Sequence, residues 1–362
     1  MRTHWLRVLT ILALLAWYIF FLAWPINLIR ADLGRHIKNG EILLSSPLHS
    51  WRPLLTTNFY SYTFPNSPFI NHHWGSGVVF YLVHHASGFN GLSIFVIAVN
   101  IATLAFFWLS ARRYVSFAQA AFISFLLIPF MAERYEVRPE IFSFLFIGIY
   151  WYILDGYRTN MIQDKMLWLL PLFQALWINL HVYFFFGFVL LAAFVIESLI
   201  QKNSQLRPGR LVTVGVAMIV TACLNPSFLK GFFYPFTIFN NYGLALEENT
   251  PLISHLRLVP GYVNGWICLL VALTVMILTL LALMKNRRSI PVSYWLVGSF
   301  IFLLVFKSVR NISFLAFFGF TFIAFLIHTL RPASPPQENR HQTYEPMAGG
   351  RHCCCQLSHT LS

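Results

Sequence analysis

Long uncharged apolar runs constrain this sequence more than any other feature. A helix that crosses the hydrocarbon core of a membrane needs roughly 20 mostly apolar residues. Six runs approach or reach that length, and each predicts a membrane-spanning helix: Val8–Ile29, Leu92–Ala111, Val115–Ala132, Tyr262–Met284, Ile290–Phe306 and Ile312–Leu330. The chain is therefore expected to be an all-α polytopic membrane protein.

Three further apolar runs do not have the length of a single span. Ile141–Leu154 and Leu211–Leu224 are short, so they can span only if flanking residues snorkel or neighbouring helices shield them. The run Met166–Ile196 is too long for one span and carries Asn179 and His181 near its middle. That pattern predicts a helical hairpin that turns at those two residues, which brings the expected total to about ten transmembrane helices.

The composition agrees with a membrane protein and excludes other classes. Hydrophobic residues make up 57% of the chain and charged residues 10%, whereas soluble domains have about 45–50% and about 25%. The net charge of +13 comes from basic residues in short clusters at the ends of apolar runs. Because membrane orientation is encoded in that way, the charge does not indicate nucleic-acid binding.

The basic residues also predict a cytoplasmic amino terminus. In that orientation the inner segments hold 15 Lys and Arg residues and the outer segments 10. The inner excess favours this orientation, and the ten outer cations are more than the positive-inside rule expects. Ten helices return the carboxyl terminus to the cytoplasm, so residues 1–330 form the transmembrane domain and the polar residues 331–362 a disordered cytoplasmic tail. Cys223 and Cys268 fall inside predicted spans, so no outer disulfide is predicted, and the role of Cys353–Cys355 is left open.

Ionisable residues are scarce inside the predicted spans. Asp155 and Glu197 lie near inner helix ends. Such groups cost about 2.5–3.5 kcal/mol each at a helix centre, and ion-coupled carriers normally place carboxylates near the midplane. Their scarcity counts against coupled transport.

Polar residues gather instead in outer segments, the first of which covers residues 29–90. It opens with a stretch in which Leu33, Ile37 and Leu44 share one side, a pattern that predicts a helix lying in the membrane interface. Asp32 precedes this helix. We interpret Asp32 as an N-cap or as a carboxylate that binds a metal or takes a proton, and the two interpretations are compatible.

The same loop contains His72, His73 and Trp74 ahead of a second predicted interfacial helix. Adjacent residues point about 100° apart on a helix, so the two histidines cannot both face one site. One of them is expected to be a metal ligand or phosphate contact and the other a structural residue.

A dense group of charges, "ERYEVRPE", lies between two predicted spans. On a helix its three glutamates, Glu133, Glu136 and Glu140, would share one face. Alternatively, Pro139 opens the next span and Glu140 falls in its first turn, where the helix dipole favours an anion.

Smaller outer segments add further polar groups. His181 at the predicted hairpin turn is either a structural residue or a ligand. Lys307 and Arg310 are three residues apart, so they either hold an anion such as a lipid phosphate or snorkel to the interface. The loop 225–261 either covers a site like a lid or connects two helices.

In their order along the chain, these motifs resemble those of the GT-C glycosyltransferases, which are polytopic enzymes that use polyprenyl-phosphate-linked sugars. The likeness covers roughly Leu6–Leu330 and rests on Asp32, "HHW" at His72–Trp74, "RPE" at Arg138–Glu140 and "NLH" at Asn179–His181. It is closest to the bacterial dolichyl-phosphate-mannose mannosyltransferase-like and aminoarabinose-transferase-like members. The resemblance implies a hexosyl- or pentosyltransferase of a bacterial plasma membrane, shortened relative to members that continue with more helices or a soluble outer domain.

The resemblance also implies roles for individual residues. The catalytic base would be Asp32. A divalent cation, Mg²⁺ or Mn²⁺, would be held by some of Asp32, Glu133, Glu140 and His72. The lipid phosphate would be held by Arg138, Lys307 and Arg310. The sugar or the acceptor, which is a glycan, a lipid or a protein, would contact His73, Asn179 and His181.

Two other functions share part of this pattern. A transporter of lipids or lipid-linked sugars would need the phosphate-binding cations but not Asp32. A non-catalytic membrane subunit would tolerate the combined loss of Asp32 and Glu140.

Overall fold

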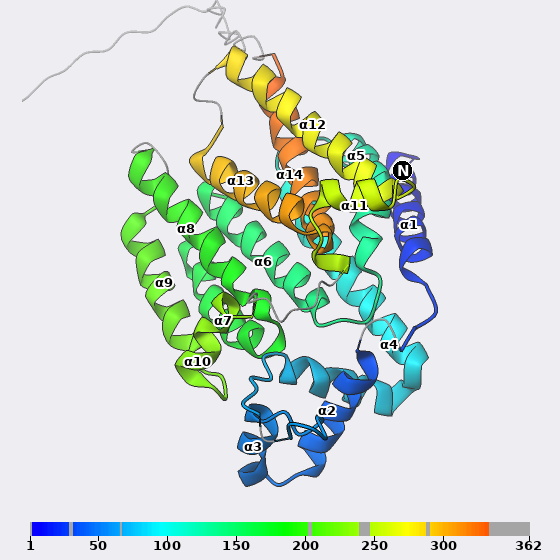
Figure 1. The fold of residues 1–362 in the computed structure, drawn as a ribbon. Helices are drawn as coiled ribbons and strands as arrows, with labels where there is room; N and C mark the ends of the chain where they lie inside the picture. The colour runs from blue at the N-terminus through cyan, green and yellow to red at the C-terminus, as the bar shows by residue number, and fades with distance from the viewer. Residues whose placement is uncertain are drawn as a thin grey trace, which may run out of the picture. The chain divides into compact units, whose positions relative to one another are not determined.

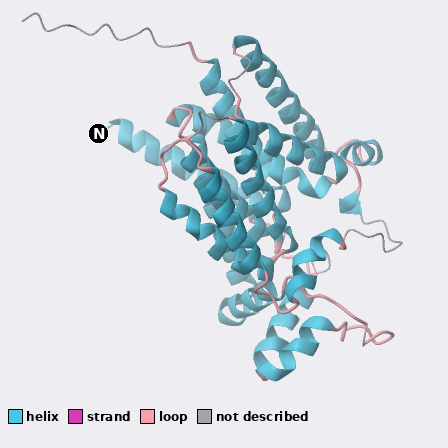
Figure 2. Ribbon diagram, turned by 90° about the vertical axis from the view of Figure 1, so that its left-hand side faces the viewer, coloured by secondary structure: helices cyan, strands magenta, loops and turns pink. Residues whose placement is uncertain are grey.

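The computed structural model describes residues 2–28, 32–65, 67–201, 205–238, 247–286 and 290–332. Within these ranges Figure 2 shows helices and loops only, and the sole β-type pairing is an isolated bridge between Thr57 and Pro68. The all-α prediction is therefore confirmed for this part of the chain. The predicted tail lies, after residue 332, outside the described residues.

Figure 1 labels the α-helices in chain order. They are α1 (Arg2–Leu22), α2 (Leu33–Ser45), α3 (Trp51–Thr56), α4 (Trp74–Ala111), α5 (Phe117–Met131), α6 (Glu140–Arg158), α7 (Leu169–Leu180), α8 (Phe185–Ile200), α9 (Pro208–Ala222), α10 (Phe228–Phe233), α11 (Leu252–Leu258), α12 (Val263–Lys285), α13 (Val292–Lys307) and α14 (Ile312–Leu330). Short 3-10 turns connect several of them: η1 (Leu48–Ser50), η2 (Ala132–Arg134), η3 (Asp164–Trp168), η4 (Val182–Phe184), η5 (Tyr234–Phe236), η6 (Glu247–Asn249) and η7 (Val309–Asn311).

Among the described residues, six helical segments are long and apolar enough to cross a membrane. They are Thr3–Leu22, Trp74–Ala111, Phe117–Arg134, Val182–Ile200, Val263–Lys285 and Val309–Leu330. The other predicted spans coincide with α6, α7, α9 and α13, which are shorter or carry more charge. The helices are those of an integral membrane protein, whereas ten crossings remain a prediction.

Helix α6 lies in the interior of the helical domain, whereas α1 and α12 form part of its apolar exterior. In α6, 16 of the 19 residues are buried. By contrast, α1 and α12 expose large apolar side chains such as Phe20 and Leu270. Apolar helix faces of that size are stable against hydrocarbon rather than water, while α6 is surrounded by protein and can therefore carry charged residues.

The first loop forms the two predicted helices, α2 and the first part of α4, and these pack against each other. Helix α2 crosses the first part of α4 where Gly40 faces Gly77, and a Cβ atom on Gly77 would lie 2.7 Å from the carbonyl oxygen of His36. Glycine is therefore required for this close approach. Gly88 interrupts α4 with a φ of 62°, so a short segment next to α2 is followed by a longer apolar segment.

The helix is interrupted at the polar residues of the predicted hairpin. Helix α7 ends before His181, whose extended backbone leads into η4 and then α8. The idea that three glutamates share one helical face is wrong, because the helical turns end at Arg134 and resume only at Glu140. Pro139 sits at the N-cap of α6, since its missing N–H has no partner to lose there.

A buried ion-pair cluster, here called the Asp155 cluster, lies at the end of α6. It consists of Asp155, Arg113, Arg158, Tyr114 and Tyr294. The carboxylate is fully buried and contacts Arg158 at 2.7 Å and Arg113 at 3.1 Å. The two tyrosine hydroxyls donate to it as well, at 2.8 Å and 3.1 Å. Every lone pair of the carboxylate is thereby engaged, so the charge is tolerated inside the domain.

Candidate functional site

A second cluster of charges, here called the Glu140 cluster, lies at the beginning of α6. It consists of Arg134, Arg138, Glu140, Glu248 and Arg310. Arg134 binds Glu140 through two parallel hydrogen bonds, Nε to Oε2 at 3.0 Å and Nη2 to Oε1 at 2.9 Å. Arg310 donates to the same Oε1 at 2.6 Å. Glu140 is thus buried between two guanidinium groups, which is the arrangement that stabilises an internal carboxylate.

Glu248 is surrounded by arginines. Its carboxylate lies 3.3 Å from Arg134, 3.0 Å from Arg138 and 3.4 Å from Arg310. These arginines come from the loop after α5 and from η7, so segments far apart in the sequence converge on one anion. Each arginine also contacts a second carboxylate, since Arg138 pairs with Glu136 at 2.7 Å.

Backbone contacts hold Glu248 in this position. The Ser308 hydroxyl donates to the Glu248 carbonyl at 2.8 Å, and the Val309 N–H donates to the Thr250 carbonyl at 3.1 Å. Turn η6 is therefore fixed against η7, and Glu248 remains only partly buried, with 26% of its side chain exposed. The three arginines around the Glu248 carboxylate thus form an anion-binding position that is partly open to solvent.

Four histidines gather next to the Glu140 cluster: His36 on α2, His72 and His73 before α4, and His181 between α7 and α8. The rings of His36 and His73 are 4.6 Å apart, and Nδ1 of His73 lies 2.9 Å from Nε2 of His72. The Ser143 hydroxyl accepts a hydrogen bond from Trp177 at 2.7 Å and lies 2.8 Å from Nδ1 of His181. The hydroxyl therefore joins Trp177 on α7 to His181, and it pairs with either tautomer of the imidazole because it has one O–H and two lone pairs.

Burial keeps these histidines neutral. It lowers the pKa of His36 to about 3, helped by the positive charges of Arg35 and Arg138 and by His72. Burial also lowers the pKa of His72 to about 4 and that of His73 well below its usual range. The pKa of His181 falls to about 3 for the same reason, although Glu140 opposes the shift. Neutral imidazoles can donate and accept hydrogen bonds at neutral pH.

Asp32 occupies the N-cap position of α2, but its side chain makes no capping hydrogen bond. Its backbone is in the left-handed region, with a φ of 51°, which Asp tolerates better than most residues. The carboxylate is 71% exposed and lies 3.3 Å from Arg35. Its partner Arg35 precedes His36 on α2 and lies close enough to lower the pKa of that histidine, after the larger effect of burial.

Other residues singled out in the sequence lie elsewhere. Glu133 accepts hydrogen bonds from Tyr262, at 2.6 Å, and from Asn264. Asn179 accepts from Trp74 at 2.9 Å, so it links the "HHW" motif to the end of α7. Lys307 is exposed at the end of α13.

The predicted cation ligands do not fit one shared ion in this arrangement. The oxygens of Glu140 face Arg134 and Arg310, and those of Glu133 face Tyr262 and Asn264. Within the described residues, no three His, Cys, Asp or Glu side chains come close enough together to hold a metal ion. The cation remains a prediction, and the chemistry below uses only the side chains of the chain.

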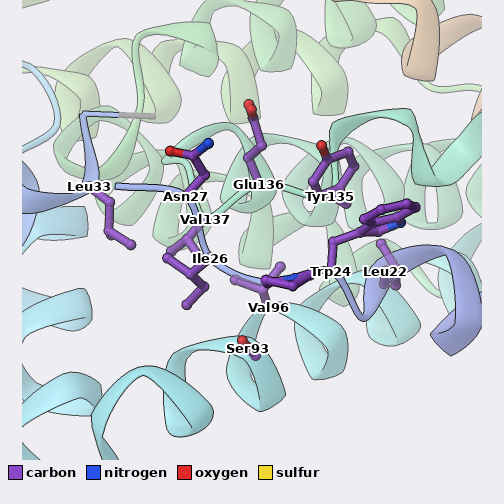
Figure 3. Close-up of a pocket in the computed structure, with 11 residues that line it drawn as sticks. Leu22, Trp24, Ile26, Asn27, Leu33, Ser93, Val96, Tyr135, Glu136 and Val137 are labelled. Atoms are coloured by element: carbon purple, nitrogen blue, oxygen red, sulfur yellow. The ribbon is translucent and has the colours of Figure 1, made fainter. Parts of the chain in front are cut away.

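A cavity of about 250 Å³ separates the end of α1 from α4 and the loop before α6. Figure 3 shows its lining, with Leu33 of α2 on one side and Trp24 and Tyr135 on the other. Glu136 and Asn27 provide polar groups. The cavity connects the segment that carries Asp32 with the loop that carries Arg138.

Comparison of the chain with protein-family models, with curated proteins and with solved structures gave no match. The site is therefore interpreted from its own geometry. That geometry brings together Arg138, Glu140, His72, His73, His181 and Arg310, which sequence analysis had selected. The prediction that the adjacent histidines cannot face one site is wrong, because His72 and His73 lie in the turn before α4 and not on a helix. Sequence analysis missed His36 and the role of Glu248. The amphipathic pattern around His36 was a usable signal, whereas nothing in the local sequence pointed to Glu248.

Proposed function

We propose that this protein is a membrane glycosyltransferase that moves a sugar from a polyprenyl-phosphate carrier to an acceptor hydroxyl. The convergence of three arginines on Glu248, near the first turn of α6, is the observation that carries the proposal. A lipid-linked phosphate sugar keeps its chain in hydrocarbon and its charged group at the surface. A suitable site therefore needs cations where apolar helices end.

The donor phosphate would bind to Arg134, Arg138 and Arg310. Guanidinium groups bind phosphate oxygens in a bidentate way and stay charged when partly buried. The Glu248 carboxylate occupies an anion position between them, so the phosphate would take its place. Positive charge fixed at that point stabilises the phosphate as negative charge grows on it during departure.

Asp32 would act as the general base. Its exposed carboxylate accepts the proton of the acceptor hydroxyl as that oxygen attacks the anomeric carbon. The bond from the anomeric carbon to the phosphate oxygen breaks, and its electron pair leaves with the lipid phosphate. A single displacement of this type inverts the anomeric configuration. A general base contributes typically 10²–10⁴-fold to the rate.

The cellular setting is part of the proposal. The positive-inside pattern supports a site on the non-cytoplasmic face of a bacterial plasma membrane, with both termini in the cytoplasm. Resemblance to the GT-C enzymes supports a hexosyl or pentosyl donor.

The test is sugar transfer in membranes that are supplied with a labelled polyprenyl-phosphate sugar. Asp32→Asn should reduce transfer by about 10²–10⁴-fold, because it removes the base without changing the size of the side chain. Glu41→Gln is the matched control, since Lys38–Glu41 is also an exposed pair three residues apart on α2, at 2.9 Å.

Three outcomes decide the proposal. Loss of transfer in Asp32→Asn with normal turnover in Glu41→Gln supports it. Unchanged turnover in Asp32→Asn contradicts the assignment of the base. Movement of labelled lipid across vesicles without any covalent product would instead make the protein a transporter.

A further inference from the structure

A second cavity, of about 280 Å³, lies entirely within the first loop. It is formed by α2, α3 and the segment that follows α3, which Figure 1 draws in blue. Its polar lining comes from Arg35, Asn39, Asn58, Tyr60 and Asn71. Among the described residues that line it, Arg35 alone is charged, and Arg35 also pairs with Asp32.

The loop around this cavity is held by its backbone. The N–H groups of Asn58, Phe69 and Asn71 donate to the carbonyls of Ser67, Thr56 and Leu55 at 2.9, 2.8 and 3.0 Å. These hydrogen bonds join the two halves of the segment, so they fix the backbone that carries the side chains lining the cavity.

The side-chain oxygens of the two buried asparagines differ in whether a hydrogen-bond donor reaches them. The Tyr60 hydroxyl donates to Oδ1 of Asn39 at 2.9 Å. Oδ1 of Asn71 is buried and has no hydrogen-bond partner among the described residues. A buried oxygen in that state is costly unless a donor reaches it. Asn71 also lines the cavity, so rotation of its amide would offer this unpaired oxygen to a ligand O–H or N–H group.

The rest of the lining restricts the ligand further. Phe59, Tyr60 and Phe69 supply aromatic surface beside the amides, and the rings of Phe59 and Tyr60 are 4.3 Å apart. Amides that both donate and accept match neighbouring hydroxyl groups, while aromatic faces match the C–H surface of a pyranose ring. An acyl chain would leave the amides unpaired, and a peptide amine would meet Arg35 with no carboxylate in the lining.

We infer that this cavity binds a saccharide, and that it holds the sugar end of the acceptor with one hydroxyl directed towards Asp32. Its role as an acceptor site rests on the proposed function, whereas saccharide binding does not. The acceptor would then be a glycan or the sugar head of a glycolipid, rather than a protein side chain or an aliphatic alcohol.

Saccharide binding is tested by saturation-transfer NMR on the full chain in lipid nanodiscs, because maltoside detergents carry competing sugars. The probes are the methyl glycosides of glucose, mannose and galactose, and cyclohexanol serves as a ring of similar size with one hydroxyl. At least one glycoside should bind. Asn71→Leu should weaken it by tenfold or more, and Tyr60→Phe by about threefold to tenfold, as expected for one hydrogen bond. The exposed Asn90→Leu is the matched control and should have no effect.

The outcomes separate this inference from the proposed function. Absence of glycoside binding, equal binding in Asn71→Leu, or equal competition by cyclohexanol overturns the inference. If Asn71→Leu does not fold, Tyr60→Phe decides, because its side chain is 44% exposed. Binding without sugar transfer retains the cavity and rejects the transferase. Transfer with an acceptor KM unchanged by these variants rejects the cavity as the acceptor site and retains the transferase.

Discussion

Helix α6 carries a buried carboxylate near each end, and the two differ in whether their arginine partners also bind another carboxylate. Asp155 accepts hydrogen bonds from two arginines and two tyrosines, so its contacts are complete within the protein. At the other end, Glu140 shares its arginines with the half-buried Glu248. A closed cluster of the first kind stabilises the fold, whereas an open cluster can exchange one carboxylate for another anion.

The surroundings extend this contrast. The Asp155 cluster lies among aromatic rings, with Arg158 over Tyr294 and Arg113 over Tyr152. The Glu140 cluster adjoins four histidines, and Glu136 beside it lines a cavity. We therefore expect substitutions at the Asp155 cluster to change stability and substitutions at the Glu140 cluster to change donor binding.

The largest effect is expected for Asp155→Asn. Removal of its charge leaves two buried guanidinium groups without a counter-ion, which costs about 3–5 kcal/mol of unfolding free energy. Thermal unfolding in nanodiscs measures the loss, and the fraction that remains folded should keep the donor KM of the wild type. Asp164→Asn is the control. It breaks a solvent-exposed pair with Arg207 and should cost less than about 1 kcal/mol.

Equal destabilisation by Asp155→Asn and Asp164→Asn would contradict the closed-cluster interpretation. So would a change of donor KM in folded Asp155→Asn protein, since the comparison assigns that property to the other end of α6.

Sequence analysis could locate the two ends of α6 but not the residues that surround the carboxylate at each end. Apolar runs place the helices, and polar residues such as His181 mark where the chain leaves a helix. The partners of Glu140 could not be predicted, because Arg134 lies six residues away and Arg310 lies 170 residues away. The cavity around Asn71 was also not predicted, since it depends on a loop closed by backbone hydrogen bonds.

A smaller effect is expected from acid. The four histidines beside the Glu140 cluster are neutral when folded, with pKa values lowered to about 3 or 4 for His36, His72 and His181. An exposed histidine in the unfolded chain has a pKa near 6.5. Below that value the unfolded state binds more protons, so stability is complete above about pH 6.5 and is lost as the pH falls towards 3.

At pH 6 the loss should be roughly 0.8 kcal/mol for each histidine and about 3 kcal/mol for the four together. Unfolding midpoints at pH 7.5 and pH 6 measure it. The difference should shrink in His73→Asn and persist in Asp155→Asn. A midpoint that does not move between these pH values would show that the histidines are already solvated in the folded protein.

The smallest effect is expected at the anion position itself. In Glu248→Gln each arginine keeps a second carboxylate, with Glu140 for Arg134 and Arg310 and Glu136 for Arg138. The fold should therefore lose less than about 1 kcal/mol. The donor phosphate no longer competes with an internal anion, so the donor KM should fall by about tenfold, which corresponds to roughly 1.4 kcal/mol. Glu136→Gln is the matched control, since it removes the same charge from Arg138 but leaves Glu248 in place. A donor KM that rises in Glu248→Gln would mean that this carboxylate arranges the arginines instead of occupying the place of the phosphate.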